Sequence, residues 1–255
     1  MSAPAELLCD NRFADGAITA TTTAAGYDAA NIASLRTAEQ WLSADTTTQY
    51  LTVDCGAVKS ADGFGLISNL HLVGASVAVE CSADNFAADT TIAYPATAVT
   101  QSVMFPSFAN QDKQQWRLAI TGLTAPGQIL KASIGQRFVF DGPIEGEFSP
   151  AVEHVMPANG LPDKGQVLEL LAAYTRLSAR ARFSLVDDVW YRETFLPVWD
   201  SWLIKFKPFF WAPNRTLRPD DAYWMWVDPA VVLDAAYHPR TWKRRFELPL
   251  QGVKL

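Results

Sequence analysis

Short runs with an apolar residue at every second position, separated by turn residues, limit most strongly how the first 137 residues can fold. The clearest runs are Tyr50–Asp54, Gly65–Ser68, Ser76–Glu80 and Gln115–Ile120. Because side chains alternate between the two faces of a strand, this pattern predicts half-buried strands. Small and polar residues at 60–63, 82–85 and 124–127 are expected to form loops. Short strands at this spacing favour a β-sandwich or jelly roll.

The second half of the chain differs from the first in its high content of aromatic residues. Sixteen of the 30 aromatic residues lie between Phe183 and Phe246, and seven of the nine Trp lie between Trp190 and Trp242. We therefore predict two domains, a β-sandwich over residues 1–137 and a smaller aromatic-rich α+β assembly domain over residues 138–255.

The second domain is predicted to be β-rich with one or two helices. Strands are expected at Arg137–Phe140, Pro208–Trp211, Ala222–Val227 and Thr241–Leu248. Apolar residues recur at helical spacing from Asp187 to about Lys205, with Asp187 and Asp188 suited to the N-terminus and Pro197 expected to kink or divide the helix. Gln166–Val186 fits either a helix or a strand. The fold class is therefore mainly β.

The charge balance makes nucleic acids and membranes poor partners. The formal net charge is −6 and the isoelectric point is near 5.1, so the chain has no overall basic surface for DNA or anionic lipid. Its first residues lack the pattern of a signal peptide, and no stretch approaches the roughly 18 apolar residues of a membrane span. We expect a soluble protein made in the cytoplasm, with no membrane partner and no sequence-specific nucleic-acid partner.

Cysteine and histidine usage predicts no metal site and no cofactor. Cys9, Cys55 and Cys81 have no CxxC spacing, and an odd number favours buried free thiols over a disulfide framework. The three histidines are scattered, so a structural zinc site is not expected. Glycine-rich loops that hold phosphates are also missing.

Motifs for catalysis are missing as well, and we predict that the protein is not an enzyme and has no catalytic residues. Neither GxSxG nor HExxH occurs around its histidines, His71 and His154 among them. The acidic pairs Glu145/Glu147 and Asp220/Asp221 could imitate a glycosidase pair, but each flanks Gly or Pro in an expected loop. Solvated turns explain them better.

Two residues of the first half have a functional and a structural explanation. Trp41 could stack on a sugar, but packing in the core is favoured. Asp54 could be a catalytic carboxylate, but an aspartate at a strand end usually accepts hydrogen bonds from the backbone of the next turn, and this second role is favoured.

Residues 11–84 carry an ordered series of short motifs. Its members are Asn31-Ile32, Arg36-Thr37, Trp41, Asp54-Cys55-Gly56 and the G-x-x-V-x-V-x-x-S-x-D segment from Gly74 to Asp84. The series resembles the discoidin, or coagulation-factor C-type (galactose-binding-like), fold in the version found in phage tail proteins. The resemblance implies a sandwich. Many such modules have an acidic residue before the Arg-Thr pair, where Ser34 and Leu35 stand here, so a calcium site in this loop is not expected.

The second half is similar to the C-terminal region of the same phage proteins. The matching residues are Gly135–Phe140, Gly146–Pro150 and Pro208–Pro213. The resemblance implies a virion structural protein of the tail tip, distal tail or baseplate hub. It also implies a homo-oligomeric ring that contacts the tail tube, hub and fibre proteins.

The aromatic concentration has two explanations, core packing and subunit interfaces. Because Trp and Tyr are enriched at interfaces, we expect some of these rings to lie between subunits, with Trp199 and Trp226 as first choices for exposed anchors. The interface candidates are Trp190, Trp199, Trp202, Trp211, Trp224, Trp226, Trp242, Arg244 and Arg245.

A basic cluster lies along the expected strand Thr241–Leu248. Arg240, Lys243, Arg244 and Arg245 alternate with aromatic residues and could bind phosphate or line a DNA-conducting lumen. A solvated strand face, or pairing with acids of a neighbouring subunit, is the more economical explanation.

The sequence thus leads to one main functional hypothesis and two alternatives. The main one is a non-enzymatic tail protein that acts through ring assembly. A carbohydrate-binding module that contacts host-surface glycans, at most weakly, is the first alternative. A hydrolase with unrecognised machinery, or an accessory subunit of an enzyme, is the second.

Overall fold

The structure is a computed structural model. It describes the chain except residues 1–3, 35, 37–38, 69, 147, 156–173, 216–217, 219–220, 229–234, 239–242 and 254–255. The described residues form 15 strands and a short helical segment, and the paired strands are all antiparallel. The predicted mainly β fold class is confirmed. No helix in this part of the chain has the length and apolar character to cross a membrane.

One long strand, β4 (Gln49–Ser68), belongs to both layers of the N-terminal half. Its first part pairs with β2 (Ile18–Ala20) and β8 (Ser107–Thr121), and its last part pairs with β7 (Val103–Met104) and β9 (Gln128–Val139). Between these parts the register shifts twice, so the strand bends without ending. The loop predicted at residues 60–63 is therefore wrong, because that segment stays paired with β8.

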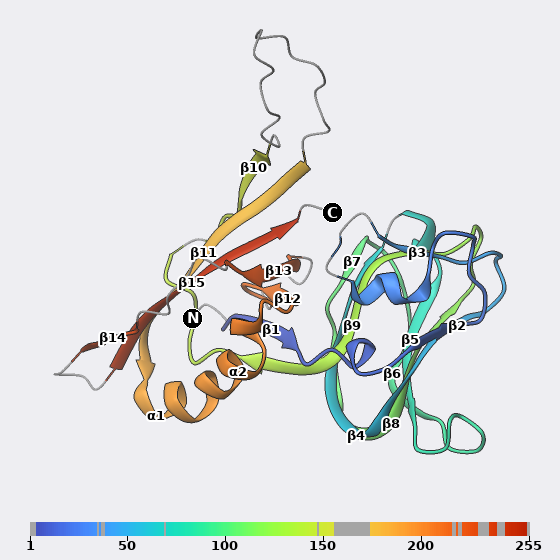
Figure 1. Ribbon diagram of the computed structural model, residues 1–255, viewed down its shortest axis with the longest axis horizontal. Helices are drawn as coiled ribbons and strands as arrows, with labels where there is room; N and C mark the ends of the chain where they lie inside the picture. The colour runs from blue at the N-terminus through green and yellow to red at the C-terminus, as the bar shows by residue number, and fades with distance from the viewer. Residues whose placement is uncertain are drawn as a thin grey trace, which may run out of the picture.

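The two layers enclose one apolar core, which makes this half a β-sandwich (Figure 1). The first layer continues from β8 to β5 (Ser76–Ser82) and β6 (Thr91–Ala98), whereas β3 (Trp41–Leu42) pairs with β9 in the second layer. Leu51 from the first layer and Phe64 from the second are both fully buried in this core.

Both tryptophans of the first half, Trp41 and Trp116, are fully buried in the same core. The Trp41 indole also donates a hydrogen bond to Thr23 Oγ1 at 3.3 Å. The predicted packing role of Trp41 is therefore confirmed. The three cysteines are buried and free, as predicted.

Strand β9 leaves the sandwich and carries its sheet into the second half. Its last residues pair with β1 (Glu6–Cys9), which pairs on its other side with β12 (Phe209–Ala212). The order continues through β13 (Tyr223–Val227), β15 (Lys243–Val253), β11 (Tyr174–Asp187) and β10 (Ala151–Val155), while β14 (Ala235–His238) pairs with β15. Hydrogen-bonded strands therefore connect both halves without a break.

A helical segment covers one face of the second half. It consists of α1 (Asp188–Trp190), the π-helical turn Tyr191–Phe195 and α2 (Leu196–Ser201). The Asp187 carboxylate caps it by accepting from the N–H groups of Val189 and Trp190. Pro197 lies in the first turn of α2, directly after the π turn, where its missing N–H is tolerated. The predicted helix is confirmed. It is not divided at Pro197, and its irregular part is the π turn that ends just before α2.

Four short 3₁₀ turns complete the described elements. They are Arg12–Ala14, Ala29–Ala33, Leu70–Leu72 and Leu203–Lys205. The segment that fitted either a helix or a strand is strand β11 from Tyr174 onward, and its earlier residues lie outside the described part. The other strands predicted in the second half correspond to β12, β13 and β15.

The described residues have two large apolar clusters, one in the sandwich and one mainly in the second half, and the second also contains residues from the start of the chain. Ala5, Leu7 and Cys9 pack in the second cluster although they begin the chain. A third, smaller cluster that includes Ile67, Phe210 and other buried residues joins the halves. Whether each predicted domain folds alone stays a prediction.

Candidate functional site

Most of the described tryptophans proposed for an interface are buried within the chain. Trp202, Trp211 and Trp224 have little or no exposed surface, and Trp199 is only 7% exposed. The choice of Trp199 as an exposed anchor is wrong, because its ring packs in the second core. Trp190 and Trp226 are half-buried, and Trp242 lies outside the described residues.

Stacked rings explain why this core accepts so many aromatic residues. Phe183 lies between Phe140, at 4.4 Å between ring centroids, and Phe246, at 5.1 Å. Phe195 from the π turn stacks on Phe246 at 4.7 Å. Aromatic pairs add stabilisation beyond the area that they bury. Core packing therefore combines rings from β11, β15, the helical segment and Phe140, which directly follows β9.

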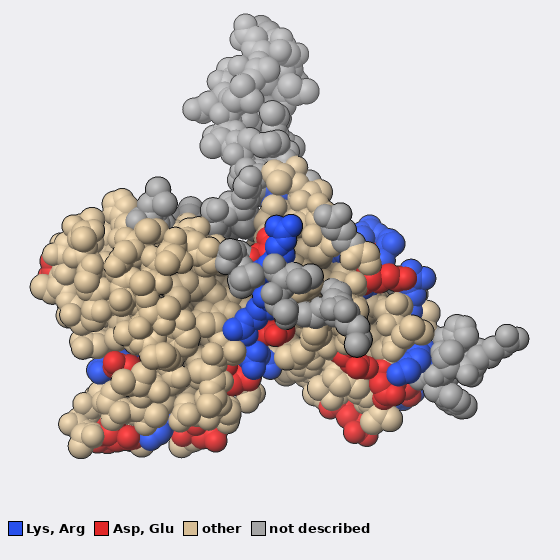
Figure 2. All heavy atoms as spheres, turned by 180° about the vertical axis from the view of Figure 1, so that it is seen from behind, with Lys and Arg blue, Asp and Glu red and all other residues tan. Residues whose placement is uncertain are grey.

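The described members of the basic cluster are paired with acids of the same chain. Arg244 forms an ion pair with Asp188 and lies 4.8 Å from the centre of the Tyr191 ring. Arg245 lies 3.3 Å from Glu145, and Lys243 lies 3.8 Å from Asp187. In the view from behind, basic and acidic side chains lie beside one another over the second half, whereas the sandwich carries large uncharged areas (Figure 2). Acids of a neighbouring subunit are not needed to balance these charges.

Exposed large apolar side chains are more numerous in the described part of the second half, and no sequence motif marks them. Six of the described large apolar residues that are exposed belong to it, against three in the sandwich. The six are Val139, Val152, Leu185, Val189, Ile204 and Phe206. Leu185 and Val189 are the most exposed of them, at 67% and 59%. A β-bulge turns Leu185 outward, and no residue pattern announces such a bulge.

The sheet of the second half has two strands with a neighbour on one side only. Among the described residues, β10 pairs with β11 alone, and β14 pairs with β15 alone. Unpaired backbone N–H and C=O groups on such edges can pair with another chain. Among the described residues of the sandwich, β2, β3, β6 and β7 likewise pair with one strand each, so open edges occur in both halves.

A polar hollow of about 470 Å³ lies between loops of the sandwich. Tyr27, Asp28, Asn31 and Glu39 are among the residues that line it. Hydrogen bonds from Ser34 and Arg36 hold the pKa of Glu39 below its usual range, so this carboxylate is charged at neutral pH. An aromatic face beside amide and carboxylate groups is chemically suited to a sugar.

A buried lysine supports one wall of this hollow. Lys131 on β9 has no exposed surface, and its Nζ donates to the carbonyl oxygens of Asn31, Arg36 and Glu39 at 2.9, 2.8 and 3.0 Å. Burial lowers the pKa of Lys131 to about 8, and the Glu39 charge partly opposes this effect. The loop from Asn31 to Glu39 is therefore tied to the sandwich by one ammonium group.

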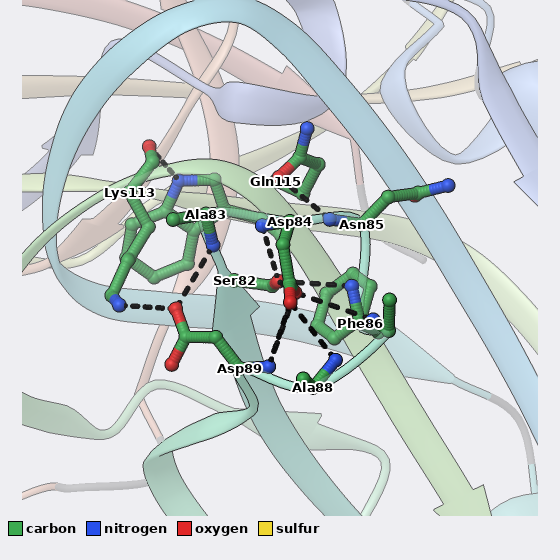
Figure 3. Close-up of polar contacts among 11 residues, drawn as sticks. Ser82, Ala83, Asp84, Asn85, Phe86, Ala88, Asp89, Lys113 and Gln115 are labelled. Carbon is green, nitrogen blue, oxygen red and sulfur yellow. Dashed lines mark hydrogen bonds and ion pairs between the residues drawn. The ribbon is translucent and has the colours of Figure 1, made fainter.

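The Asp84 carboxylate organises the loop after β5 (Figure 3). It accepts hydrogen bonds from the N–H groups of Ala87, Ala88 and Asp89, and from the Ser82 hydroxyl. Asp89 forms an ion pair of 2.6 Å with Lys113. The Ser82 hydroxyl, with these N–H groups, holds the pKa of Asp84 below its usual range. The Asp84 carboxylate oxygens therefore stabilise the loop by accepting hydrogen bonds from its own backbone.

Other acids that could suggest catalysis also have local partners. Asp54 accepts from the Gly56 N–H at 2.8 Å and from the Gln114 and Gln115 side chains, so the predicted hydrogen bond to the backbone is confirmed. The predicted strand end is wrong, because β4 continues through Asp54 to Ser68 with a shift of register. Asp221 accepts from the Tyr223 hydroxyl at 2.7 Å, whereas Asp220 and Glu147 lie outside the described residues. Within the described part of the chain, His, Cys, Asp and Glu form no group that could hold a metal.

Comparisons with known proteins give similarities in solved structures only. No protein-family model and no curated protein matches the chain. Chitosan-binding module 1 of a chitosanase/glucanase from Paenibacillus sp. IK-5 is similar, with a TM-score of 0.44 and 18% identity over 49% of this chain and 98% of that module. Module 2, solved with chitotriose, has a TM-score of 0.43 and 16% identity over 48% of this chain and 96% of its own. The family 32 module of Clostridium perfringens NanJ, solved with galactose, has a TM-score of 0.43 and 10% identity over 52% and 99%. The similarity extends over about half of this chain.

Proposed function

We propose that this chain is a non-enzymatic structural protein of a phage tail, at the tail tip, distal tail or baseplate hub. The observation that carries the proposal is the larger number of exposed large apolar side chains in the described part of the second half, six against three in the sandwich. Such a surface is suited to contacts with other subunits. The tail assignment itself rests on the resemblance of Gly135–Phe140 and Pro208–Pro213 to phage tail proteins.

The mechanism we propose is assembly into a ring. The sandwich, with its own core, would decorate the ring while the second half makes the contacts between copies. Trp226 and Trp190, which are half-buried, remain candidates for those contacts. Arg244 forms an ion pair with Asp188 at the start of the helical segment, and Arg245 forms one with Glu145 in the loop after β9, so both pair within the chain.

The proposal is tested by finding the protein in virions. A phage that carries the gene with a small epitope tag is grown, its particles are purified, and gold-labelled antibody is located by electron microscopy. We expect gold at the end of the tail and more than one copy per particle by quantitative mass spectrometry. Particles without the protein, with all of it in the lysate, would contradict the proposal.

A second candidate function, weak glycan binding, is favoured by the loop hollow beside Tyr27 and Asp28. We expect dissociation constants of about 1 mM for chitotriose or galactose, equivalent to about −4 kcal/mol. Tyr27→Ala should abolish binding without lowering the melting temperature, because this side chain lies on a loop. Titration calorimetry checks the binding and a thermal unfolding scan checks the melting temperature, with Tyr50→Ala on the sheet as the matched control. Equal binding by wild type and Tyr27→Ala would exclude this hollow.

A further inference from the structure

A pocket of about 240 Å³ lies where the sandwich meets the second half. Tyr94 and Ala98 line it from β6, Met104 lines it from β7, and Phe105 directly follows β7. Arg215, which follows β12, lines it from the second half. The volume equals roughly eight water molecules of ~30 Å³ each, so the pocket has room for one small molecule.

The charge of this pocket comes from one arginine. Among the described residues, Arg215 is the only charged one that lines the pocket, and no aspartate or glutamate does so. Its guanidinium lies 5.8 Å from the centre of the Phe105 ring, and its side chain is 23% exposed. A ligand in the pocket therefore meets one positive charge beside an apolar wall.

The acid that pairs with Arg215 is shared with a second arginine. Glu6 Oε2 lies 3.4 Å from Nη1 of Arg215 but 3.1 Å from Nη1 of Arg137, which also has Asp62 at 3.6 Å. Glu6 does not line the pocket. An arginine has five N–H donors, and within the described part of the chain Arg215 makes this one hydrogen bond. Most of its donors are therefore available to a ligand.

A single guanidinium favours a carboxylate over other common anions. The planar fork of arginine matches the two oxygens of a carboxylate and can donate to both. A carboxylate has one negative charge, which one arginine balances. A phosphate ester has a charge of about −1.5 to −2 at neutral pH, and a lone Arg215 would leave part of it unbalanced. The arginine therefore predicts a ligand with one carboxylate.

The rest of the lining is suited to a hydroxylated ring. Tyr94 and Thr100 contribute hydroxyl groups and Gln101 contributes an amide, whereas Met104 and Phe105 contribute apolar surface. Small-molecule sites combine apolar walls with a few polar groups that fix the orientation of the ligand. A sugar ring needs both, because it has hydroxyl groups at its edge and C–H groups on its faces. The lining and the arginine together are suited to a sugar that has a carboxylate.

We propose that this pocket binds a hexuronate, with the carboxylate on Arg215 and the ring against Met104 and Phe105. The inference goes beyond the proposed assembly function and does not depend on it. It also differs from the glycan binding proposed for the hollow beside Tyr27, because a neutral sugar makes no use of the Arg215 charge. Since Arg215 belongs to the second half, this site requires both halves of the chain.

An NMR titration of the full-length protein tests the ligand class, with sodium galacturonate as the probe and galactose as its neutral counterpart. We expect a dissociation constant of about 1 mM for galacturonate. Galactose should bind at least about tenfold more weakly, because it lacks the charge-assisted hydrogen bonds to the guanidinium. Raising the salt from about 50 to about 500 mM should weaken galacturonate binding and leave galactose unchanged. No galacturonate binding, or phosphate bound as tightly, would overturn the proposal.

Substitutions on both sides of the pocket locate the binding. Arg215→Gln should weaken galacturonate binding at least about tenfold, because the charge-assisted hydrogen bonds are lost. Arg192→Gln, at an exposed ion pair with Asp188, is its control and should bind like wild type. Ala98→Phe should fill the pocket and block binding while the Arg215 side chain is kept. Ala96→Phe is the matched control, because Ala96 is also exposed and on β6 but does not line the pocket.

Melting temperatures of the four variants are compared with that of wild type. If Arg215→Gln is destabilised, the two alanine variants decide, since both change exposed residues of one strand. Galacturonate binding that is unchanged in Ala98→Phe, or lost equally in Ala96→Phe, would overturn the proposal. Binding that is lost in Tyr27→Ala but kept in Arg215→Gln would assign the sugar to the hollow beside Tyr27 and overturn it as well.

Discussion

Replacing Gly135 with alanine is expected to lower the free energy of unfolding by about 3 kcal/mol, at the upper end of the cost of overpacking. A Cβ at this position would lie 2.3 Å from the carbonyl oxygen of Cys9 and 2.9 Å from that of Asp10. Both are backbone atoms, and Cys9 ends β1, which links β9 to β12. The clash can be relieved only by moving β1, so we expect the joint between the halves to open.

Urea denaturation followed by tryptophan fluorescence measures this effect, and amide hydrogen exchange in β1 and β12 locates it. Gly127→Ala is the matched control. The Cβ there would meet only side-chain atoms of Leu123 and Leu72, at 3.2 Å, and these can move aside. Its cost should stay below about 1 kcal/mol. If the two variants are equally stable, the close approach of β1 to β9 does not govern the joint.

Lys131→Met is the second change with a large expected effect, again about 3 kcal/mol of unfolding free energy. Methionine fills a similar volume but leaves the carbonyl oxygens of Asn31, Arg36 and Glu39 without their donor. Unsatisfied buried acceptors each carry a desolvation cost. The 31–39 loop should therefore loosen, and the glycan binding proposed for the neighbouring hollow should weaken with it.

Thermal unfolding and exchange of the loop amides check this prediction. Lys113→Met is the control, because Lys113 forms a partly exposed ion pair with Asp89 and should cost about 1 kcal/mol at most. A Lys131 variant as stable as this control would show that the three carbonyl contacts do not hold the loop.

The pH dependence of the Lys131 effect has a definite sign. The pKa of Lys131 is lowered in the folded chain from its usual value of 10.5 to about 8, because the side chain is buried. Between these values the unfolded state binds the proton more tightly, so stability rises with pH. The advantage of wild type over Lys131→Met should therefore grow from pH 8 to pH 10. A constant difference would mean that the pKa is not lowered.

Alternation of apolar residues was sufficient to predict most strands, because it follows from strand geometry itself. It failed at residues 60–63, where small and polar residues suggested a loop. There β4 bends through shifts of register while it remains paired with β8. The pairing with β8 keeps these residues in the strand, although their own side chains favour a loop. For β11, the sequence predicted a strand only toward the end, where arginine and apolar residues alternate from Arg180 to Phe183.

The candidate site was harder to predict, since composition does not tell a core ring from an interface ring. Trp199 and Trp226 looked alike in sequence, yet the first is buried and the second is half-buried. From sequence alone, Lys131 would be predicted to be exposed to solvent, because its three carbonyl partners lie roughly 100 residues away in the chain. Leu185 would pass for a core residue, because the bulge that exposes it depends on pairing with β15.

The central claim, that the second half carries the assembly contacts, is tested most directly by the copy number of matched surface variants in purified tails. One full-length variant replaces four exposed residues of that half with aspartate, and the other does the same to three exposed residues of the sandwich. The first set is Leu185, Val189, Ile204 and Phe206, and the second is Val58, Val73 and Ile92.

We expect both variants to unfold at the wild-type temperature, because every changed side chain is exposed. This melting temperature is measured first. Mass spectrometry of the particles, formed in a host that supplies only the variant, then gives the copy number. We expect the second-half variant to be lost from tails and the sandwich variant to be present at the wild-type copy number. Tails that retain the second-half variant but lose the sandwich variant would contradict the account.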